Sequence, residues 1–134
     1  MSTKKAKILL AKPGLDGHDV GVKVLAHALT EEGFEIVYTG LRKTVREIVQ
    51  IAIAKKADII GLSVLSGSHI GISEQMANEM KENKLSIPWI IGGNIPDNDV
   101  SILEEKGATK AFATGTGIAE VIEYFNKTRV REDE

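Results

Sequence analysis

The chain contains no cysteine, carries a formal net charge of only -2, and has no apolar run long enough to cross a membrane. Without cysteine it can form no disulfide, no thiolate metal site and no thiol nucleophile, which fits an intracellular compartment. The small net charge argues against a polyanion-binding surface, so nucleic acid is not an expected partner. Residues 1–5 are not followed by the apolar core of a signal peptide. We therefore expect a soluble cytoplasmic protein that does not bind membranes.

What is present fits one folded domain. The chain has 134 residues, of which 43% are hydrophobic and 27% charged, and no linker, repeat or low-complexity stretch interrupts it. We expect a single domain over residues 1–134. Its core should run from about residue 7 to residue 126, and the charged tail 127–134 should be frayed.

Short apolar runs alternate five times with longer stretches of helical periodicity, which is typical of βαβ units. The expected strands are 8–11, 34–38, 59–63, 89–91 and 111–113. The expected helices follow each strand, beginning near Val22, at Thr44, near Ile72, at Asp97 and at Ile118.

The second helix has the clearest start signal. Thr44 and Glu47 have the spacing of a capping box, in which each side chain bonds the other residue's backbone. The expected buried stripe of this helix is formed by Val45, Ile48, Val49, Ala52 and Ile53.

The alternation predicts an α/β fold, a single doubly wound parallel sheet of five strands in the flavodoxin-like order 2-1-3-4-5. Ligands of such sheets bind outside the carboxyl ends of the strands, at the switch point between strands 1 and 3. Four loops rich in glycine or hydroxyl residues gather at that edge: 12–21, 63–69, 92–96 and 113–117.

The first of these loops holds the segment Asp16-Gly17-His18-Asp19. Histidine is a common metal ligand, and a carboxylate two residues earlier can hold its second ring nitrogen and raise its basicity. Gly21 follows, where a missing side chain would let a bulky group pass. A solvated loop histidine is the alternative, but Asp16 and the place at a strand end favour a ligand role for His18.

The other histidines and the strand serine have simpler interpretations. His27 lies on the polar side of the first helix and is assigned to the surface, and His69 fits the start of the third helix. The Ser63 hydroxyl is nearly as well explained by a bond to backbone as by a ligand contact.

These loops together resemble the B12-binding domain of methylmalonyl-CoA mutase over about residues 7 to 126. The matching positions are Lys12, Asp16, His18 and Gly21, then Ser63, Leu65 and His69, then Gly92, Gly93, Ile95, Pro96 and Asp99, then Gly115 and Thr116. Ala113 departs from the glycine common in those mutases.

The resemblance implies adenosylcobalamin as the cofactor, with cobalt bound base-off by His18. Asp16 would accept the proton of the second imidazole nitrogen, and Lys12 would extend that relay. The remaining implied cofactor contacts are Gly17, Asp19, Gly21, Ser63, Leu65, Gly67, Gly92, Gly93, Gly115 and Thr116. Among these, Gly21, Gly92 and Gly93 would admit the displaced nucleotide tail, Ser63 would bond its base, and Leu65 would pack against it.

In the family a separate barrel domain binds the acyl-CoA, so the resemblance implies a large barrel-type mutase subunit as partner. We expect the cofactor-binding small subunit of an isomerase, inactive alone, that interconverts methylmalonyl-CoA and succinyl-CoA. A related isobutyryl-CoA or 2-hydroxyisobutyryl-CoA mutase is the near alternative, and a corrinoid carrier for methyl transfer is a more distant one. A signalling receiver domain lacks support because the third strand ends at Ser63 where a receiver needs aspartate. A flavin carrier would need a hydroxyl-rich phosphate loop at 12–21.

Overall fold

A computed structural model describes residues 3–13, 20–41, 43–64 and 67–131. The five strands of its main sheet are β2 (Lys7–Ala11), β3 (Glu35–Tyr38), β4 (Ile59–Val64), β5 (Trp89–Gly93) and β6 (Lys110–Ala111). The helices are α1 (Val20–Glu31), α2 (Val45–Lys55), α3 (His69–Glu82), the 3-10 turn η1 (Asp97–Asp99), α4 (Val100–Glu105) and α5 (Ile118–Asn126).

The sheet is entirely parallel, and its strands lie in the order β3-β2-β4-β5-β6. Numbered along the chain, this is the predicted order 2-1-3-4-5, so the expected fold is confirmed. The register places Ser63 of β4 opposite Gly92 of β5, and Val64 opposite Gly93. The strand β2 pairs with both β3 and β4, which puts the switch point where the sequence analysis expected it.

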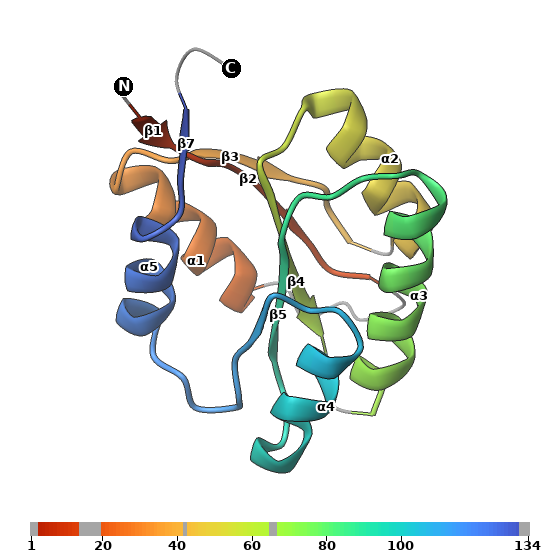
Figure 1. Cartoon of the computed structure of the whole chain (residues 1–134). Helices are drawn as coiled ribbons and strands as arrows, with labels where there is room; N and C mark the ends of the chain where they lie inside the picture. Colours follow the sequence, from red (N-terminus) through yellow and green to blue (C-terminus); the bar gives the residue numbers. More distant parts are fainter. Residues whose placement is uncertain (1–2, 14–19, 42, 65–66, 132–134) are drawn as a thin grey trace.

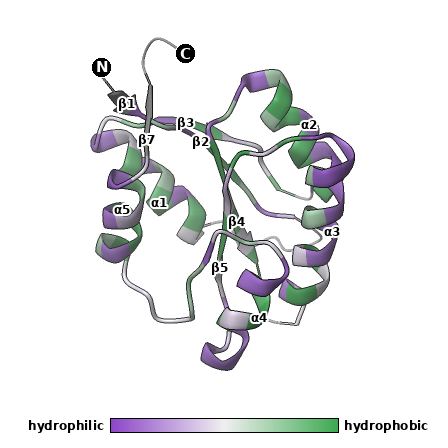
Figure 2. Cartoon of the chain, in the orientation of Figure 1, coloured by the Kyte–Doolittle hydropathy of each residue, from purple (hydrophilic) through white to green (hydrophobic). Residues whose placement is uncertain are grey.

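Helices cover both faces of the sheet (Figure 1). Helices α1 and α5 cover one face, where Leu29, Ile59 and Phe125 are buried in one cluster. Helices α2, α3 and α4 cover the other, where Ile48 and Met76 belong to a second cluster. In Figure 2 the helices carry bands of both colours, as expected for elements with one buried and one exposed side. We call these the α1/α5 face and the α2/α3/α4 face.

The capping box of α2 is present as predicted. The Glu47 N–H donates to Thr44 Oγ1 at 3.1 Å, and the Thr44 N–H donates to Glu47 Oε1 at 2.9 Å. The bond from the Thr44 N–H, and secondarily the neighbouring Thr44 side chain, favour the charged carboxylate and lower the pKa of Glu47.

Three local expectations about helices are wrong. Ile53 is 41% exposed, whereas the other members of the predicted stripe are buried. At 3.6 residues per turn it lies roughly a quarter turn from the centre of that stripe, toward solvent. Helix α3 begins at His69, three residues before the expected start, and the expected fourth helix is divided into η1 and α4.

Part of the charged tail pairs with the N-terminal segment. A second, two-stranded sheet joins β1 (Thr3–Lys5) to β7 (Arg129–Arg131) in antiparallel register. The tail predicted to fray is therefore paired over residues 129–131, because the backbone of the N-terminal segment offers it a partner. None of the helices in the described part of the chain combines the length and the hydropathy that crossing a bilayer requires.

Candidate functional site at the carboxyl edge of the sheet

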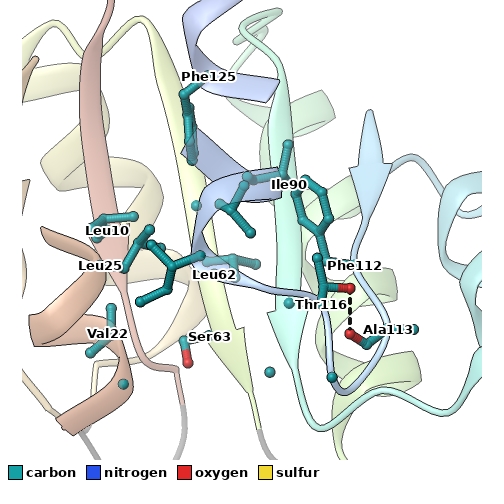
Figure 3. Close-up of a pocket in the computed structure, with 17 residues that line it drawn as sticks. Leu10, Val22, Leu25, Leu62, Ser63, Ile90, Phe112, Ala113, Thr116 and Phe125 are labelled. Carbon is teal, nitrogen blue, oxygen red and sulfur yellow. Dashed lines mark hydrogen bonds between the residues drawn. The ribbon is translucent and has the colours of Figure 1, made fainter. Parts of the chain in front are cut away.

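A cavity of about 250 Å³ lies between the sheet and helices α1 and α5, beside the carboxyl ends of β4 and β5 (Figure 3). Seven of the predicted cofactor contacts fall within the described residues, and six of them line this cavity. These six are Gly21, Ser63, Gly92, Gly93, Gly115 and Thr116. The seventh, Gly67, is not among the lining residues. The structure thus brings residues from α1, β4, β5 and the loop between β6 and α5 around one space.

The cavity exists because inward-facing side chains shrink along two adjacent strands. Alternate residues of a strand face the same side of the sheet. On the α1/α5 face, β4 presents Ile59, then Gly61, then Ser63, and β5 presents Ile90, then Gly92. The isoleucines are part of the buried cluster, whereas the smaller residues leave the space unfilled. The sequence itself therefore opens the sheet face toward its carboxyl edge.

The walls of the cavity are mainly apolar. Leu10, Val22, Leu25, Phe112 and Phe125 supply side chains to them (Figure 3). Phe125 has no exposed surface and Phe112 has little, so these rings are fixed by the surrounding core. Such walls suit a largely apolar group better than a charged one.

Two hydroxyl side chains line the cavity, those of Ser63 and Thr116. Thr116 Oγ1 donates to the Ala113 carbonyl oxygen at 2.7 Å, a bond that holds the loop between β6 and α5. Lys12, which is 2% exposed, donates from Nζ to Ser63 Oγ at 3.3 Å and to the Ser63 carbonyl at 3.4 Å. Because Ser63 Oγ accepts from the Lys12 ammonium group, the hydrogen of the Ser63 hydroxyl can be donated to an acceptor in the cavity.

The glycines around the cavity have different reasons for lacking a side chain. A Cβ at Gly21 would meet nothing within 4 Å, and at Gly92 its nearest neighbour would be Phe112 Cβ at 3.6 Å. Neither has a positive φ, so the fold does not require glycine at either place. Gly93 has φ +117°, and a Cβ there would collide with the Val64 carbonyl oxygen. The fold therefore requires Gly93, whereas Gly21 and Gly92 leave room for a ligand.

His69 lies outside the cavity and does more than begin a helix. It is 5% exposed, and its Nε2 lies 2.7 Å from Asp99 Oδ2 at the end of η1. The Gly67 N–H donates to its Nδ1 at 3.2 Å. His27, in contrast, is an exposed partner of Glu31 on α1, as its assignment to the surface predicted.

The residues predicted to hold cobalt fall outside the described part of the chain. They are Asp16, Gly17, His18 and Asp19, and the same is true of Leu65 after β4. Their roles stay predictions. Among the described residues, no group of three or more histidine, aspartate or glutamate side chains is placed to hold a metal ion.

The sequence analysis missed Gly61 and the apolar walls. Gly61 lines the cavity in the middle of β4, where an added Cβ would lie 2.9 Å from Leu10 Cδ2. The signal was present as a glycine inside a buried strand, which often marks a close approach or an empty space. The walls carry no such signal because buried leucine and phenylalanine are the ordinary residues of any core.

Comparison with known proteins gives a consistent assignment. Residues 6–123 match the family model described as the B12 binding domain. The chain is 36% identical over 117 residues to the 2-hydroxyisobutanoyl-CoA mutase small subunit of Aquincola tertiaricarbonis, covering 87% of this chain and 86% of that protein. It is 39% identical over 106 residues to ethylmalonyl-CoA mutase of Cereibacter sphaeroides, covering 79% of this chain but 16% of that longer protein.

A solved structure shows the same arrangement of elements. The cobalamin-binding protein from Desulfitobacterium hafniense superposes with a TM-score of 0.78 at 26% identity, covering 92% of this chain and 59% of that one. The similarity extends over nearly the whole of the described sheet and its helices.

Proposed function

The chain belongs to the B12-binding domain family, and from this premise we propose that it is the cobalamin-binding small subunit of a heteromeric, adenosylcobalamin-dependent acyl-CoA mutase. The observation that carries the proposal is the cavity at the carboxyl edge of the sheet, where Gly21 and Gly92 leave space that the fold itself does not need. The relatives are acyl-CoA mutases, one of them a small subunit of nearly the same extent.

The residues present fit the nucleotide tail of cobalamin. The walls are apolar, as an aromatic base requires, and Ser63 offers one hydroxyl for a ring nitrogen. The glycines on β5 and at the start of α1 allow such a group to approach the backbone. When bound, adenosylcobalamin supplies homolysis of its cobalt–carbon bond, which starts radical rearrangements of the carbon skeleton.

We assign the cobalt ligand to His18, in the loop that leads from β2 to α1. Asp16 would accept the proton on its other ring nitrogen and keep the free nitrogen directed at the metal. Lys12 would extend this relay, since its ammonium group lies buried at the end of β2. The hydrogen bond from Lys12 to Ser63 would link the loop that holds His18 to the cavity proposed for the nucleotide tail.

We assign the acyl-CoA to a separate large, barrel-type subunit, which would enclose the substrate and exclude water from the radicals. The first candidate reaction is the interconversion of methylmalonyl-CoA and succinyl-CoA. The second is a 2-hydroxyisobutyryl-CoA rearrangement, favoured by the nearly complete overlap with the small subunit of that mutase. The carboxyl edge of the sheet would face the large subunit, because the cobalt must reach the substrate.

The cobalt assignment is tested by electron spin resonance of the cob(II)alamin complex. Protein labelled with nitrogen-15 histidine should show the altered hyperfine pattern of one coordinating histidine nitrogen, and His18→Ala should lose it. Asp16→Asn should still bind cobalamin, about 10 to 100-fold more weakly. If the hyperfine pattern of the labelled protein equals that of the unlabelled protein, or if His18→Ala binds cobalamin as tightly as wild type, the assignment is wrong.

The partnership is tested by turnover. The chain saturated with adenosylcobalamin should not isomerise any acyl-CoA alone, and should do so when a matching large subunit is added. A charge reversal at the exposed Asp97 should lower activity at limiting small subunit more than it lowers cobalamin binding. Asp99 is unsuitable for this purpose because it is bonded to His69. Turnover by the chain alone, or association with a methyltransferase in place of a mutase subunit, would overturn the proposal.

A further inference from the structure

We propose that His69 and Asp99 are positioning residues that hold the carboxyl-edge loops in the arrangement that accepts the nucleotide tail of cobalamin. The inference rests on the proposed function, because it assigns the tail to the cavity beside β4 and β5. Neither side chain lines that cavity, so each would act through the loops that it joins.

The hydrogen bonds of His69 fix its tautomer. The Gly67 N–H donates to Nδ1, so Nδ1 carries no hydrogen and the imidazole hydrogen is on Nε2. Nε2 then donates to the Asp99 carboxylate at 2.7 Å, a charge-assisted bond. Both ring nitrogens are occupied, which leaves neither for a ligand. The ring is therefore a bridge between two loops and not a ligand-binding group.

The bond between His69 and Asp99 joins the segments that follow the adjacent strands β4 and β5. The register of β4 and β5 ends with Val64 opposite Gly93, and the Asn94 N–H donates to the Val64 carbonyl at 3.0 Å. Among the described residues beyond this point, the bond from His69 at the start of α3 to Asp99 at the end of η1 again joins the two segments. Ser63 and Gly92, which line the cavity, form the register pair immediately before Val64 and Gly93.

A third loop is tied to the same assembly. The Ile95 carbonyl accepts from the Thr114 N–H at 2.9 Å and from Thr114 Oγ1 at 3.2 Å. Gly115 and Thr116, directly after Thr114, line the cavity from the side of α5. The pair thus connects the loop after β4 to the loop after β5, and Thr114 connects the latter to the loop after β6. A displacement at His69 would pass to both sides of the cavity.

The bond between His69 and Asp99 is not an exposed surface ion pair. His69 is almost fully buried and Asp99 is only partly exposed, with 25% of its side chain accessible. Removing the Asp99 carboxylate would leave the buried imidazole N–H unsatisfied, which costs more than the bond contributes. His27 and Glu31 form a pair of similar length, 2.6 Å, but both side chains are mostly exposed. That pair is a matched control on the same protein.

The experiment compares dissociation constants for cobalamin and for cobinamide, which lacks the nucleotide tail, by equilibrium dialysis with the full chain. Wild type should bind cobalamin more tightly. His69→Ala should reduce this preference about tenfold, because the loss of roughly one hydrogen bond between the loops changes the affinity for the tail by about that factor. His27→Ala should leave it unchanged. Loss of cobalt ligation, or general destabilisation, would weaken both corrinoids alike and would not change the preference.

Conservative variants separate the two ends of the bridge. His69→Asn keeps an acceptor near the position of Nδ1 for the Gly67 N–H, and His69→Gln keeps a donor that can reach toward Asp99. Each should reduce the preference less than His69→Ala does. Asp99→Asn keeps an acceptor without the charge and should have the smallest effect. These milder variants provide the test where His69→Ala does not fold, as judged by thermal unfolding.

The possible results separate a failure of the proposed function from a failure of the positioning role of His69 and Asp99. A wild-type chain that binds neither corrinoid overturns the proposed function, and the inference with it. A wild-type chain that prefers cobalamin, with folded His69 and Asp99 variants that keep the full preference, overturns the inference alone. A graded loss of preference from Asp99→Asn through His69→Asn and His69→Gln to His69→Ala supports it.

Discussion

The two faces of the sheet are built from the same kinds of element but are filled differently. On the α2/α3/α4 face, large side chains such as Ile48, Met76 and Leu103 have no exposed surface and form a continuous core. On the α1/α5 face, a cluster of similar residues stops short of the carboxyl edge and leaves the cavity. Helix α5 contributes a single fully buried side chain, Phe125.

The difference indicates that one face of the sheet mainly provides stability and the other provides space for a ligand. A closed core provides stability because apolar surface is removed from water and the packing is dense. A face with unfilled space gives up part of that stabilisation, and the binding of a ligand can restore it. We therefore expect substitutions on the α2/α3/α4 face to change the free energy of unfolding, and substitutions around the cavity to change ligand affinity.

The largest expected effect is on the closed face. Ile48→Ala should lower the free energy of unfolding by about 4 kcal/mol, since it removes a fully buried side chain and leaves a hole. Ile53→Ala is a matched control, because the same residue type on the same helix is 41% exposed there. Urea unfolding measures both. Equal losses at the two positions would contradict the assigned burial, and an altered preference between cobalamin and cobinamide would contradict the division between faces.

Next in size is the effect at Gly93. Gly93→Ala should lower the free energy of unfolding by about 3 kcal/mol, because alanine is strained at φ +117° and its Cβ meets the Val64 carbonyl. The neighbouring Gly92→Ala should change stability far less. Thermal unfolding of the two variants is the measurement. A stable Gly93→Ala protein would remove the structural explanation and leave the tail itself as the reason for glycine.

Gly92→Val should act on the ligand and not on the fold. The branched side chain would extend into the cavity, and cobalamin binding should weaken about tenfold or more, whereas cobinamide binding should change little. Gly21→Leu should behave similarly from the opposite wall, since a Cβ there meets nothing within 4 Å. Equilibrium dialysis with the two corrinoids decides. If both lose affinity equally, the glycines serve loop conformation and not the passage of the tail.

The smallest effect concerns the start of α2. Thr44→Ala should lower the free energy of unfolding by about 1 kcal/mol near neutral pH, because the capping hydroxyl is lost. The pKa of Glu47 is lowered in the folded state, so its contribution is present above the unfolded pKa and is lost as pH falls through the folded pKa. The backbone N–H of residue 44, the larger cause of this lowering, remains in Thr44→Ala, but the contribution of the Thr44 side chain is lost. The difference in unfolding free energy between wild type and Thr44→Ala should therefore shrink in acid by that side-chain contribution. A difference that grows on acidification would show that the capping box does not hold Glu47 in its charged form.

Much of the fold could be predicted because its signals are local. Apolar runs marked the strands of the sheet, and Thr44 with Glu47 marked the start of α2 to the residue. The order of strands followed from the alternation of strands and helices, with parallel crossovers. Ser63, Gly92 and Gly93 were found for the same reason, since they lie at the ends of β4 and β5.

The remainder depends on partners distant in the sequence. The bond from His69 to Asp99 spans 30 positions, and no local pattern pairs these two residues. The strand β7 needs β1, which is more than a hundred residues earlier, so its own composition suggested only a frayed tail. Ile53 was wrongly assigned to the buried stripe because it lies at the margin of that stripe. Whether a residue at the margin is buried depends on packing against neighbouring elements, which the spacing alone does not show.

The small ribbon of β1 and β7 has a consequence for how the domain can be attached to other polypeptides. Thr3 pairs with Arg131, so the two ends of the described chain lie together, at the amino ends of the sheet strands and away from the cavity (Figure 1). A tether added at either end would leave from the edge remote from the tail site. Fusion to a larger polypeptide and free association with one are therefore equally compatible with an open cavity, and a permuted chain joined through the ribbon should retain it.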